Sequence, residues 1–182
     1  MSNEREITQL IPLLNNRINQ LEQLKSFTDI KRRQQFSNAY IIGRLTYMMP
    51  TYTNLNINQK DELHKILMRT ARMTLNSYCF KQSIESILEK CNWVTINDMI
   101  KQCALKFTNN LLLKHKPSFL YSNLKINKRA CSNISFISIP RSNGLKSTLL
   151  YKGSSLYNQL PKQLKHLKAK TFKENISQRC IY

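Results

Sequence analysis

The chain has 182 residues, of which 41% are hydrophobic, so it can form one ordinary domain or two small ones. It carries 29 Lys and Arg against 10 Asp and Glu, a formal net charge of +19, and a charge of this size is typical of proteins that bind a polyanion. It has no apolar run of the roughly 20 residues that span a membrane and no signal peptide, so we expect an intracellular protein, in the nucleus or cytoplasm, that is neither secreted nor bound to a membrane.

The five cysteines and three histidines are scattered along the chain and form no C-x-x-C pair. Structural zinc sites normally show close ligand pairs, because a tight turn brings two ligands to one metal. We therefore expect reduced, partly buried thiols and no metal site.

The beginning of the chain shows the spacing of amphipathic helices. Apolar residues recur at three- and four-residue steps over 7–24, which predicts a first helix. Thr28 or Asp29 can cap a second helix over 30–48, and Pro50 prevents its continuation.

Three more helices follow in the pattern. A third is predicted over 56–75, with an apolar face and a basic one, and a short fourth over 83–91. Thr95 and Asp98 have the spacing of a capping box, so Thr95 can accept from the Asp98 backbone while the Asp98 side chain bonds back. They predict a fifth helix over 96–111.

Beyond residue 121 the helical periodicity weakens. The run 134–139 is β-prone, and the turn 142–144 could lead the segment 148–151 back to pair with it as a hairpin. A last short helix is predicted to start at Thr171. The sequence thus predicts a mainly α fold: a three-helix unit over 1–78, a helical linker region over 79–121, and a basic, irregular C-terminal region over 122–182 with a short β-hairpin.

The residues that polymerase or nuclease chemistry requires are not clustered in this sequence. Two-metal catalysis needs several carboxylates together, whereas Asp29, Asp61 and Asp98 each belong to a different predicted helix start. Asp61 and Glu62 are adjacent, but we place them in the first turn of a helix, where acids stabilise the helix dipole. No Gly-rich phosphate loop or G-x-S-x-G motif occurs. We expect no catalytic residue, no cofactor, and no enzyme activity from this chain alone.

Four stretches of the sequence contain short motifs that follow one another in a characteristic order. They are Leu10–Phe27 followed by Phe36–Tyr47, which ends Arg-Leu-Thr-Tyr; Leu63–Thr74; Cys91–Ile100 followed by Lys-Pro-Ser-Phe-Leu at 116–120; and Gly144–Ile176, with Leu-Tyr-Asn-Gln-Leu-Pro at 156–161. In this order they resemble the thumb and post-thumb region of LINE-like, non-LTR retrotransposon reverse transcriptases. One departure is the stretch 48–52, Met-Met-Pro-Thr-Tyr, where the family often has an aromatic-Trp pair.

The resemblance implies that 1–78 is a thumb-like unit and that a palm domain with the catalytic Asp pair would precede Met1. It also implies a function: binding and positioning template–primer nucleic acid (RNA, DNA or an RNA–DNA hybrid) without polymerising it. The partners would be nucleic acid and the missing palm domain. The alternatives are a free-standing basic nucleic-acid-binding protein derived from such an element, a protein-interaction module that docks an acidic partner, and a truncated remnant without function.

In a thumb, basic helix faces follow phosphates rather than bases. The candidates for such contacts are Arg17, Lys31, Arg32, Arg33, Arg44, Lys60, Lys65, Arg69 and Arg72 on predicted helices, and Lys125, Lys128, Arg129, Arg141, Lys146 and Lys152 in the later region. Tyr151 and Tyr157 are candidates for stacking on unpaired bases. Four other aromatic residues lie on predicted apolar faces, where we expect core packing: Tyr40, Tyr47, Trp93 and Phe107.

Overall fold

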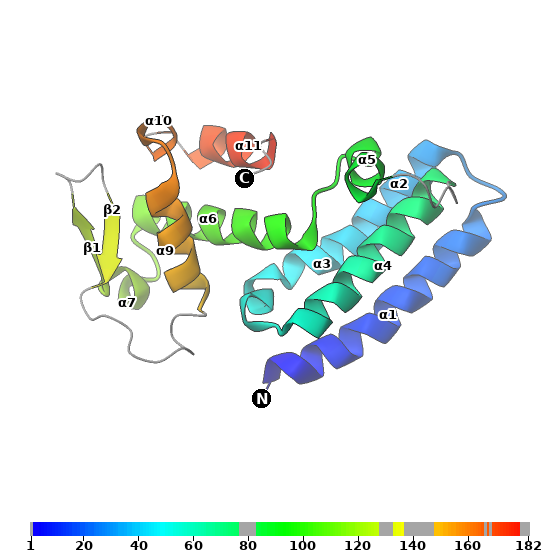
Figure 1. Cartoon of the computed structure of the whole chain (residues 1–182), viewed down its shortest axis with the longest axis horizontal. Coiled ribbons are helices and arrows are strands. Elements are labelled where there is room, and N and C mark those ends of the chain that lie inside the picture. Colours follow the sequence, from blue (N-terminus) through cyan, green and yellow to red (C-terminus); the bar gives the residue numbers. More distant parts are fainter. Residues whose placement is uncertain are drawn as a thin grey trace. The chain divides into compact units, whose positions relative to one another are not determined.

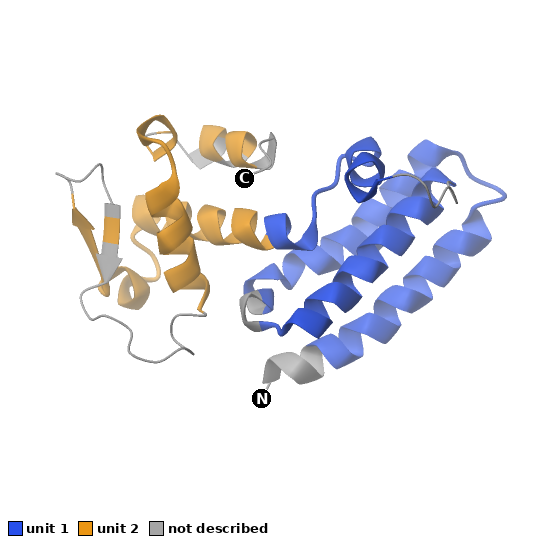
Figure 2. Ribbon diagram, viewed as in Figure 1, with its two compact units in different colours: residues 1–99 blue, residues 100–182 orange. Residues whose placement is uncertain are grey.

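The computed structural model describes residues 2–76, 83–127, 133–136, 148–165, 167 and 169–178. Over these residues the chain is mainly helical, which confirms the predicted fold class. It divides into two compact units, 1–99 and 100–182, shown in blue and orange in Figure 2. The boundary lies in the first turn of a helix, whereas the sequence suggested divisions after residues 78 and 121. No helix within the described ranges is both long and apolar enough to cross a membrane.

Unit 1 is built from three long helical segments that lie side by side (Figure 1). The first is helix α1, and the second is a continuous run of α2, a π-helical turn η1 and α3. After the 3-10 segment η2 comes the third, α4, and then the short α5. Their bounds are α1 Ser2–Leu24, α2 Ile30–Ser37, η1 Asn38–Ile42, α3 Gly43–Tyr47, η2 Met49–Asn54, α4 Ile57–Leu75 and α5 Ile84–Lys90.

The helix starts follow local capping chemistry. The Asp29 side chain accepts from the backbone of Arg32 at 2.9 Å, which confirms the predicted start of α2. Asn56 and Gln59 form a reciprocal capping box at the start of α4. Asp61 lies beyond the first turn of α4, so its predicted position in that turn, with Glu62, was wrong.

The predicted cap of the next helix, α6 (Ile96–Lys114), pairs Thr95 with Asp98. Thr95 Oγ1 accepts from the Asp98 backbone at 3.2 Å, as predicted. The Asp98 carboxylate also accepts from the Thr95 hydroxyl at 2.7 Å. Helix α6 ends at Lys114, three residues beyond the predicted range 96–111 and before Pro117.

A buried polar seam joins α2 to α4 inside unit 1. It consists of Arg33, Ser37, Thr70 and Thr74, all within the interior. The hydroxyls of Ser37 and Thr74 lie 2.7 Å apart, and Thr74 and Thr70 donate to the carbonyls one turn earlier on α4. Arg33 Nε donates to the Thr74 carbonyl at 3.0 Å. The helix pair is therefore held by specific hydrogen bonds as well as by the surrounding apolar core.

The corner between α5 and α6 is held against α2 and η1 by two side chains. Gln34 donates to the Cys91 carbonyl at 2.9 Å, and the Trp93 indole N–H donates to the Asn38 side chain at 2.8 Å. Cys91 and Trp93 are both buried. The corner is thus part of unit 1.

Unit 2 contains most of α6, a two-stranded antiparallel sheet and several shorter helices. Their bounds are α7 Ser118–Tyr121, β1 Leu124–Asn127, β2 Asn133–Phe136, α9 Leu149–Gln159, α10 Lys162–Lys165 and α11 Ala169–Gln178. The strands pair in the register Leu124 with Phe136 and Asn127 with Asn133. The region after residue 122 is therefore more regular than the sequence suggested.

The predicted hairpin partner was wrong. Strand β2 pairs with the preceding β1, whereas 149–151 form the first turn of α9, capped by Thr148. Asn158 of α9 joins the sheet through its amide, which donates to the Ile134 carbonyl and accepts from the Ile134 N–H, both at 2.8 Å. The turn 142–144 lies outside the described residues.

Among the described residues, the apolar core of unit 2 gathers side chains from α6, α9, α10, α11 and both strands, and Leu120 and Tyr121 of α7 pack against it. Its buried members are Leu105, Leu111, Leu124, Ile134, Tyr157, Leu160, Leu164, Phe172 and Ile176. Helix α9 also comes very close to α6 at Gly153: a Cβ there would lie 2.2 Å from Thr108 Oγ1 and 2.8 Å from the Ala104 carbonyl oxygen. Only glycine fits that position without displacing a neighbour.

Candidate nucleic-acid interface

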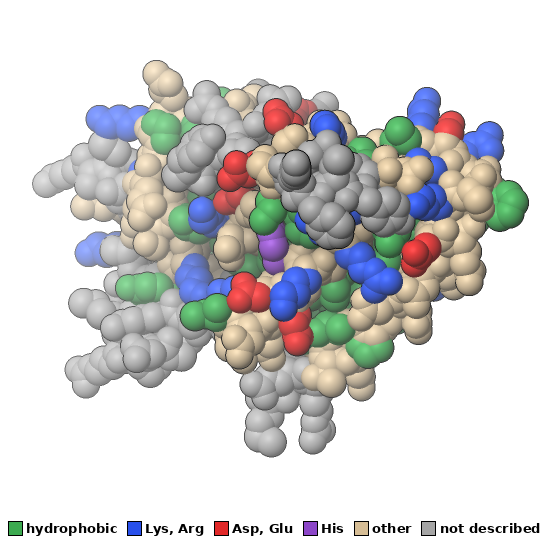
Figure 3. All heavy atoms as spheres, turned by 45° about the vertical axis from the view of Figure 1, so that its right-hand side comes forward, with side chains coloured by type: hydrophobic (Ala, Val, Ile, Leu, Met, Phe, Trp, Pro, Cys, Tyr) green, Lys and Arg blue, Asp and Glu red, His purple; other side chains and the backbone are tan. Residues whose placement is uncertain are grey.

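Charge is distributed unequally between the two units. Residues 1–99 hold 13 Lys and Arg against nine Asp and Glu, whereas residues 100–182 hold 16 against one. Most of the net charge of +19 thus belongs to unit 2. On the face of unit 1 seen in Figure 3, blue Lys and Arg side chains lie among red Asp and Glu and green apolar ones.

An open pocket of about 430 Å³ lies along the outer face of α4 in unit 1. Its lining residues are His64, Lys65, Met68, Arg69, Arg72 and Met73 from α4, with Ile84 from the start of α5. Helical spacing produces most of this set, because Met68, Arg69 and Arg72 lie three, four and seven positions after Lys65 and so fall on one side of the helix. We call this set the α4 pocket.

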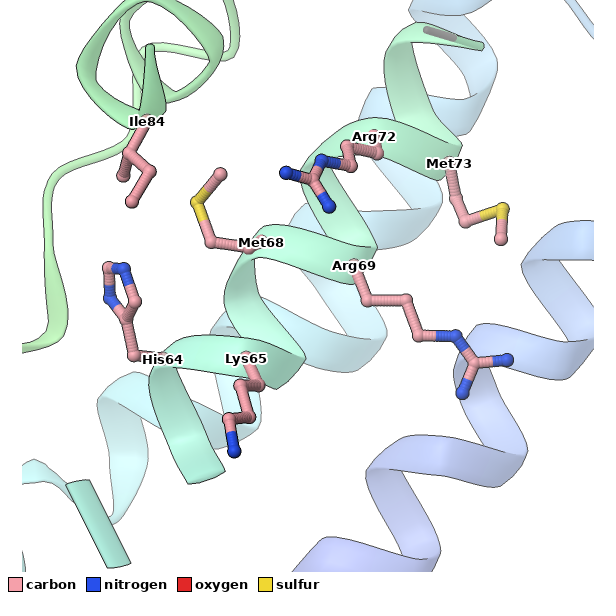
Figure 4. A pocket seen from close by; sticks show the side chains of 7 residues that line it. All are labelled: His64, Lys65, Met68, Arg69, Arg72, Met73 and Ile84. Atoms are coloured by element: carbon pink, nitrogen blue, oxygen red, sulfur yellow. The ribbon is translucent and has the colours of Figure 1, made fainter. Parts of the chain in front are cut away.

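The α4 pocket combines an apolar floor with a cationic rim. Met68 and Met73 are buried, and Ile84 faces Met68 and His64 across the pocket (Figure 4). Lys65 and Arg69 are exposed, so their charged ends are available to an anionic ligand. Such a surface suits a ligand with both anionic groups and a flat or apolar part.

Arg69 extends from the pocket toward α1 (Figure 4). Its Nη2 lies 3.3 Å from Asn19 Oδ1 and 3.9 Å from Glu22 Oε2, and the Arg69 and Glu22 side chains are 46% and 51% exposed. An ion pair this long and this exposed to solvent contributes little stability and gives way readily to a competing phosphate. Arg69 therefore stays a candidate for phosphate binding.

A second pocket, of about 280 Å³, lies between α6 and α9 within unit 2. It is lined by Ile100, Lys101, Ala104, Tyr151, Lys152, Ser155 and Leu156. Two of the predicted residues, Tyr151 and Lys152, are thus brought together, and α6 adds Lys101. We call this set the α6–α9 pocket.

The other predicted cations take several positions. Lys31, Arg32 and Arg44 are exposed on the second helical segment, and Lys125 is exposed on β1. Arg17 and Lys60 are half-buried on α1 and α4. Four candidates lie outside the described residues: Lys128, Arg129, Arg141 and Lys146.

Arg33 is a correction to the predicted interface. It is 5% exposed, and its guanidinium donates to the carbonyls of Thr74 at 3.0 Å, Lys25 at 3.1 Å and Thr28. A guanidinium so surrounded cannot reach a phosphate outside the unit. Arg33 therefore holds the turn between α1 and α2 against the end of α4.

Tyr157 is a second correction. It is 3% exposed, its hydroxyl donates to the Lys165 carbonyl at 3.2 Å, and its ring lies 6.4 Å from that of Phe172. Burial raises the pKa of this hydroxyl above its ordinary value. Tyr157 belongs to the core of unit 2 and offers no face to a base, whereas Tyr151 stays at the α6–α9 pocket.

The expectation that four further aromatic residues pack in the core holds for two of them. Trp93 is buried, and Phe107 packs against the core of unit 2. Tyr40 and Tyr47 are instead 49% and 83% exposed, so their predicted burial was wrong.

Sequence reasoning missed the residues that complete the two pockets. Ile84 falls in the short helix predicted over 83–91 and Met68 in the helix predicted over 56–75, and neither was singled out for binding. Lys101 lies one turn before the buried Leu105 on α6, so its spacing alone places it beside the apolar face and does not indicate a binding surface. Lys101 and Lys152 line the same pocket because α6 packs against α9. No local sequence pattern predicts this packing.

The described cysteines are free thiols in different surroundings. Cys91 is buried, and burial raises the pKa of its thiol to about 11. Cys103 is half-buried; burial raises the pKa of its thiol, partly offset by the charge of Lys106. Among the residues that the structure describes, no three His, Cys, Asp or Glu side chains gather in a way that could hold a metal ion.

Comparison with known proteins identifies no match: no family model fits the chain, and neither a curated protein nor a solved structure is significantly similar to it.

Proposed function

We propose that this chain binds nucleic acid through the phosphate backbone, as the thumb and post-thumb region of the LINE-type reverse transcriptases that its sequence resembles would do. The observation that carries the proposal is the row of cations on α4. Lys65, Arg69 and Arg72 line one pocket at steps of four and three residues, so they extend over about 10 Å of helix. This length matches contacts to neighbouring phosphates of one strand.

Unit 2 would supply the larger, sequence-independent part of the affinity. Its 16 Lys and Arg against one acid create a positive field that attracts any polyanion. The α6–α9 pocket adds Lys101, Tyr151 and Lys152 at one place on this unit. Unit 1 would then orient a nucleic acid that unit 2 has attracted.

The proposal is tested by equilibrium binding of the full chain to duplex DNA and to an RNA–DNA hybrid across a salt series. Each phosphate contact contributes about 0.9 to the slope of log affinity against log salt for duplex DNA. The double variant Lys65→Ala/Arg69→Ala should lower the slope by about 1.8 if both residues contact phosphate. A preference for the hybrid would support a thumb-like role.

The matched control is Lys31→Ala/Arg32→Ala, which removes one Lys and one Arg from exposed positions of the same unit outside either pocket. We expect this control to change the slope less than the α4 variant does. Equal changes would show that α4 has no special role and that only total charge matters. No binding of the folded wild-type chain at low salt would refute the proposed function.

A further inference from the structure

Three side chains from two helical segments form a partly exposed stack on unit 1. The rings of Phe36 and Tyr40 lie 4.8 Å apart, tilted by 40°. The Arg17 guanidinium carbon, from α1, lies 5.5 Å from the centre of the Tyr40 ring. Tyr40 is 49% exposed, and Arg17 also donates to Gln20 at 2.7 Å, which restrains its guanidinium. We call Arg17, Phe36 and Tyr40 the aromatic platform.

The π-helical turn η1 is the reason that Tyr40 is on the surface. An uninterrupted α-helix turns by 100° per residue, so Tyr40 would lie within about 20° of the inward direction of Arg33, and Arg44 would as well. Instead the buried residues of this segment are Arg33, Ser37, Ile41 and Leu45, at even steps of four. The extra residue in η1 turns Ile41 and Leu45 inward and leaves Tyr40 exposed.

Arg44 is brought to the surface by the same turn. It is exposed one helical step after Tyr40, where a cation can contact the phosphate next to a base bound at the platform. Arg17 in the platform and Arg44 one turn beyond Tyr40 thus supply two cations that attract a nucleic-acid strand.

We infer that the aromatic platform is a stacking site for an unpaired base of a single-stranded nucleic acid, with Arg44 on the adjoining phosphate. This inference rests on the proposed function and names a strand type that the α4 pocket does not. Bases stack on aromatic rings and on guanidinium planes, so a base can extend the Phe36–Tyr40–Arg17 stack. In a duplex the bases already stack on one another, which leaves the platform without a ligand. Turns of π-helix inside α-helices occur frequently at functional sites.

The test compares binding of the full chain to a short oligothymidylate and to a blunt DNA duplex of equal length. Stacking contributes about 1–3 kcal/mol per base, so Tyr40→Ala should weaken binding of the single strand by roughly 5- to 150-fold. Duplex binding should change by less than about twofold, because the removed side chain is uncharged. Tyr40→Phe keeps the ring and should bind both probes as the wild type does.

Tyr47→Ala is the matched control, since Tyr47 is a more exposed tyrosine of the same segment outside the platform. Circular dichroism and Trp93 fluorescence verify that each variant is folded. An equal loss for both probes in Tyr40→Ala, or no loss for the single strand while the wild type binds it, would overturn the stacking site alone. A wild-type chain that binds neither probe would instead refute the proposed function.

Discussion

Replacing Arg33 tests whether the third residue of the Lys-Arg-Arg run at 31–33 is structural. Arg33→Ala removes donors from the carbonyls of Lys25, Thr28 and Thr74. The bond to Thr74 is buried, whereas those to the turn are partly open to water, which can replace the lost donor there. The main cost is therefore one unsatisfied buried carbonyl and the space left by the side chain.

The magnitude follows from these contacts. A hydrogen bond from a charged group contributes about 1.5–3 kcal/mol, and a large-to-small change in the interior adds a cavity cost. Removing the buried charge also removes its desolvation cost, which offsets part of the loss. We expect Arg33→Ala to lower the free energy of unfolding by about 2–3 kcal/mol, a shift in urea midpoint of about 1 M or more.

Urea unfolding followed by Trp93 fluorescence measures this change, because Trp93 is the only tryptophan and lies in unit 1. The control is Arg32→Ala, which removes the same charge from the exposed neighbouring position and should change stability by less than about 0.5 kcal/mol. The alanine also keeps the backbone N–H that donates to Asp29. Arg33→Lys, with one nitrogen in place of three, should be intermediate. Equal stabilities of the two alanine variants would refute the structural assignment of Arg33.

Two further predictions concern Gly153 and Cys91, which have no role in the proposed binding. Gly153→Ala should destabilise the chain by about 1–3 kcal/mol through overpacking against Thr108 and Ala104, despite the better helix propensity of alanine. Adding Thr108→Ala should restore only part of the lost stability. If Gly153→Ala is as stable as the wild type in thermal unfolding, the close contact is contradicted. Because burial raises the pKa of Cys91 to about 11, its thiolate becomes abundant only above that pH in the folded chain and near pH 9 in the unfolded one. At pH 8, iodoacetamide should therefore label Cys91 on the order of a hundredfold more slowly in the native chain than in urea, as followed by peptide mass mapping; equal rates would show that this thiol is not buried.

Local signals in the sequence predicted most of the helices. The caps at Asp29 and Thr95 and the apolar periodicity of α1 and α4 act within a few residues, so they can be read without the fold. Pairing of β2 could not be read in this way. The segments before and after it in the sequence, 124–127 and 148–151, are both apolar enough to form a strand. Only tertiary contacts such as those of Asn158 decide which of them pairs with β2.

The candidate interface was predictable where it depends on one helix. Lys65, Arg69 and Arg72 follow from the period of α4, and the structure brings them to one pocket. The exposed position of Tyr40 was not predictable, because one π-helical turn shifts the helix phase and leaves no mark in the residue types. The burial of Arg33 was not predictable either. A basic run is usually exposed to solvent, and Arg33 is buried because it donates to carbonyls up to 41 residues away in the sequence.

The polar seam between α2 and α4 restricts unit 1 to one alignment of these helices. Apolar side chains in a helix bundle are nearly interchangeable, so a purely apolar pair could slide by one turn, about 5.4 Å, at small cost. A slide of α2 along α4 would separate Ser37 from Thr74 and take the Thr74 carbonyl away from the Arg33 guanidinium, which would keep only its acceptors in the turn, Lys25 and Thr28. Because Tyr40 continues from α2 and the cations of the α4 pocket belong to α4, the seam also sets the spacing between a stacked base and the phosphates that α4 would hold.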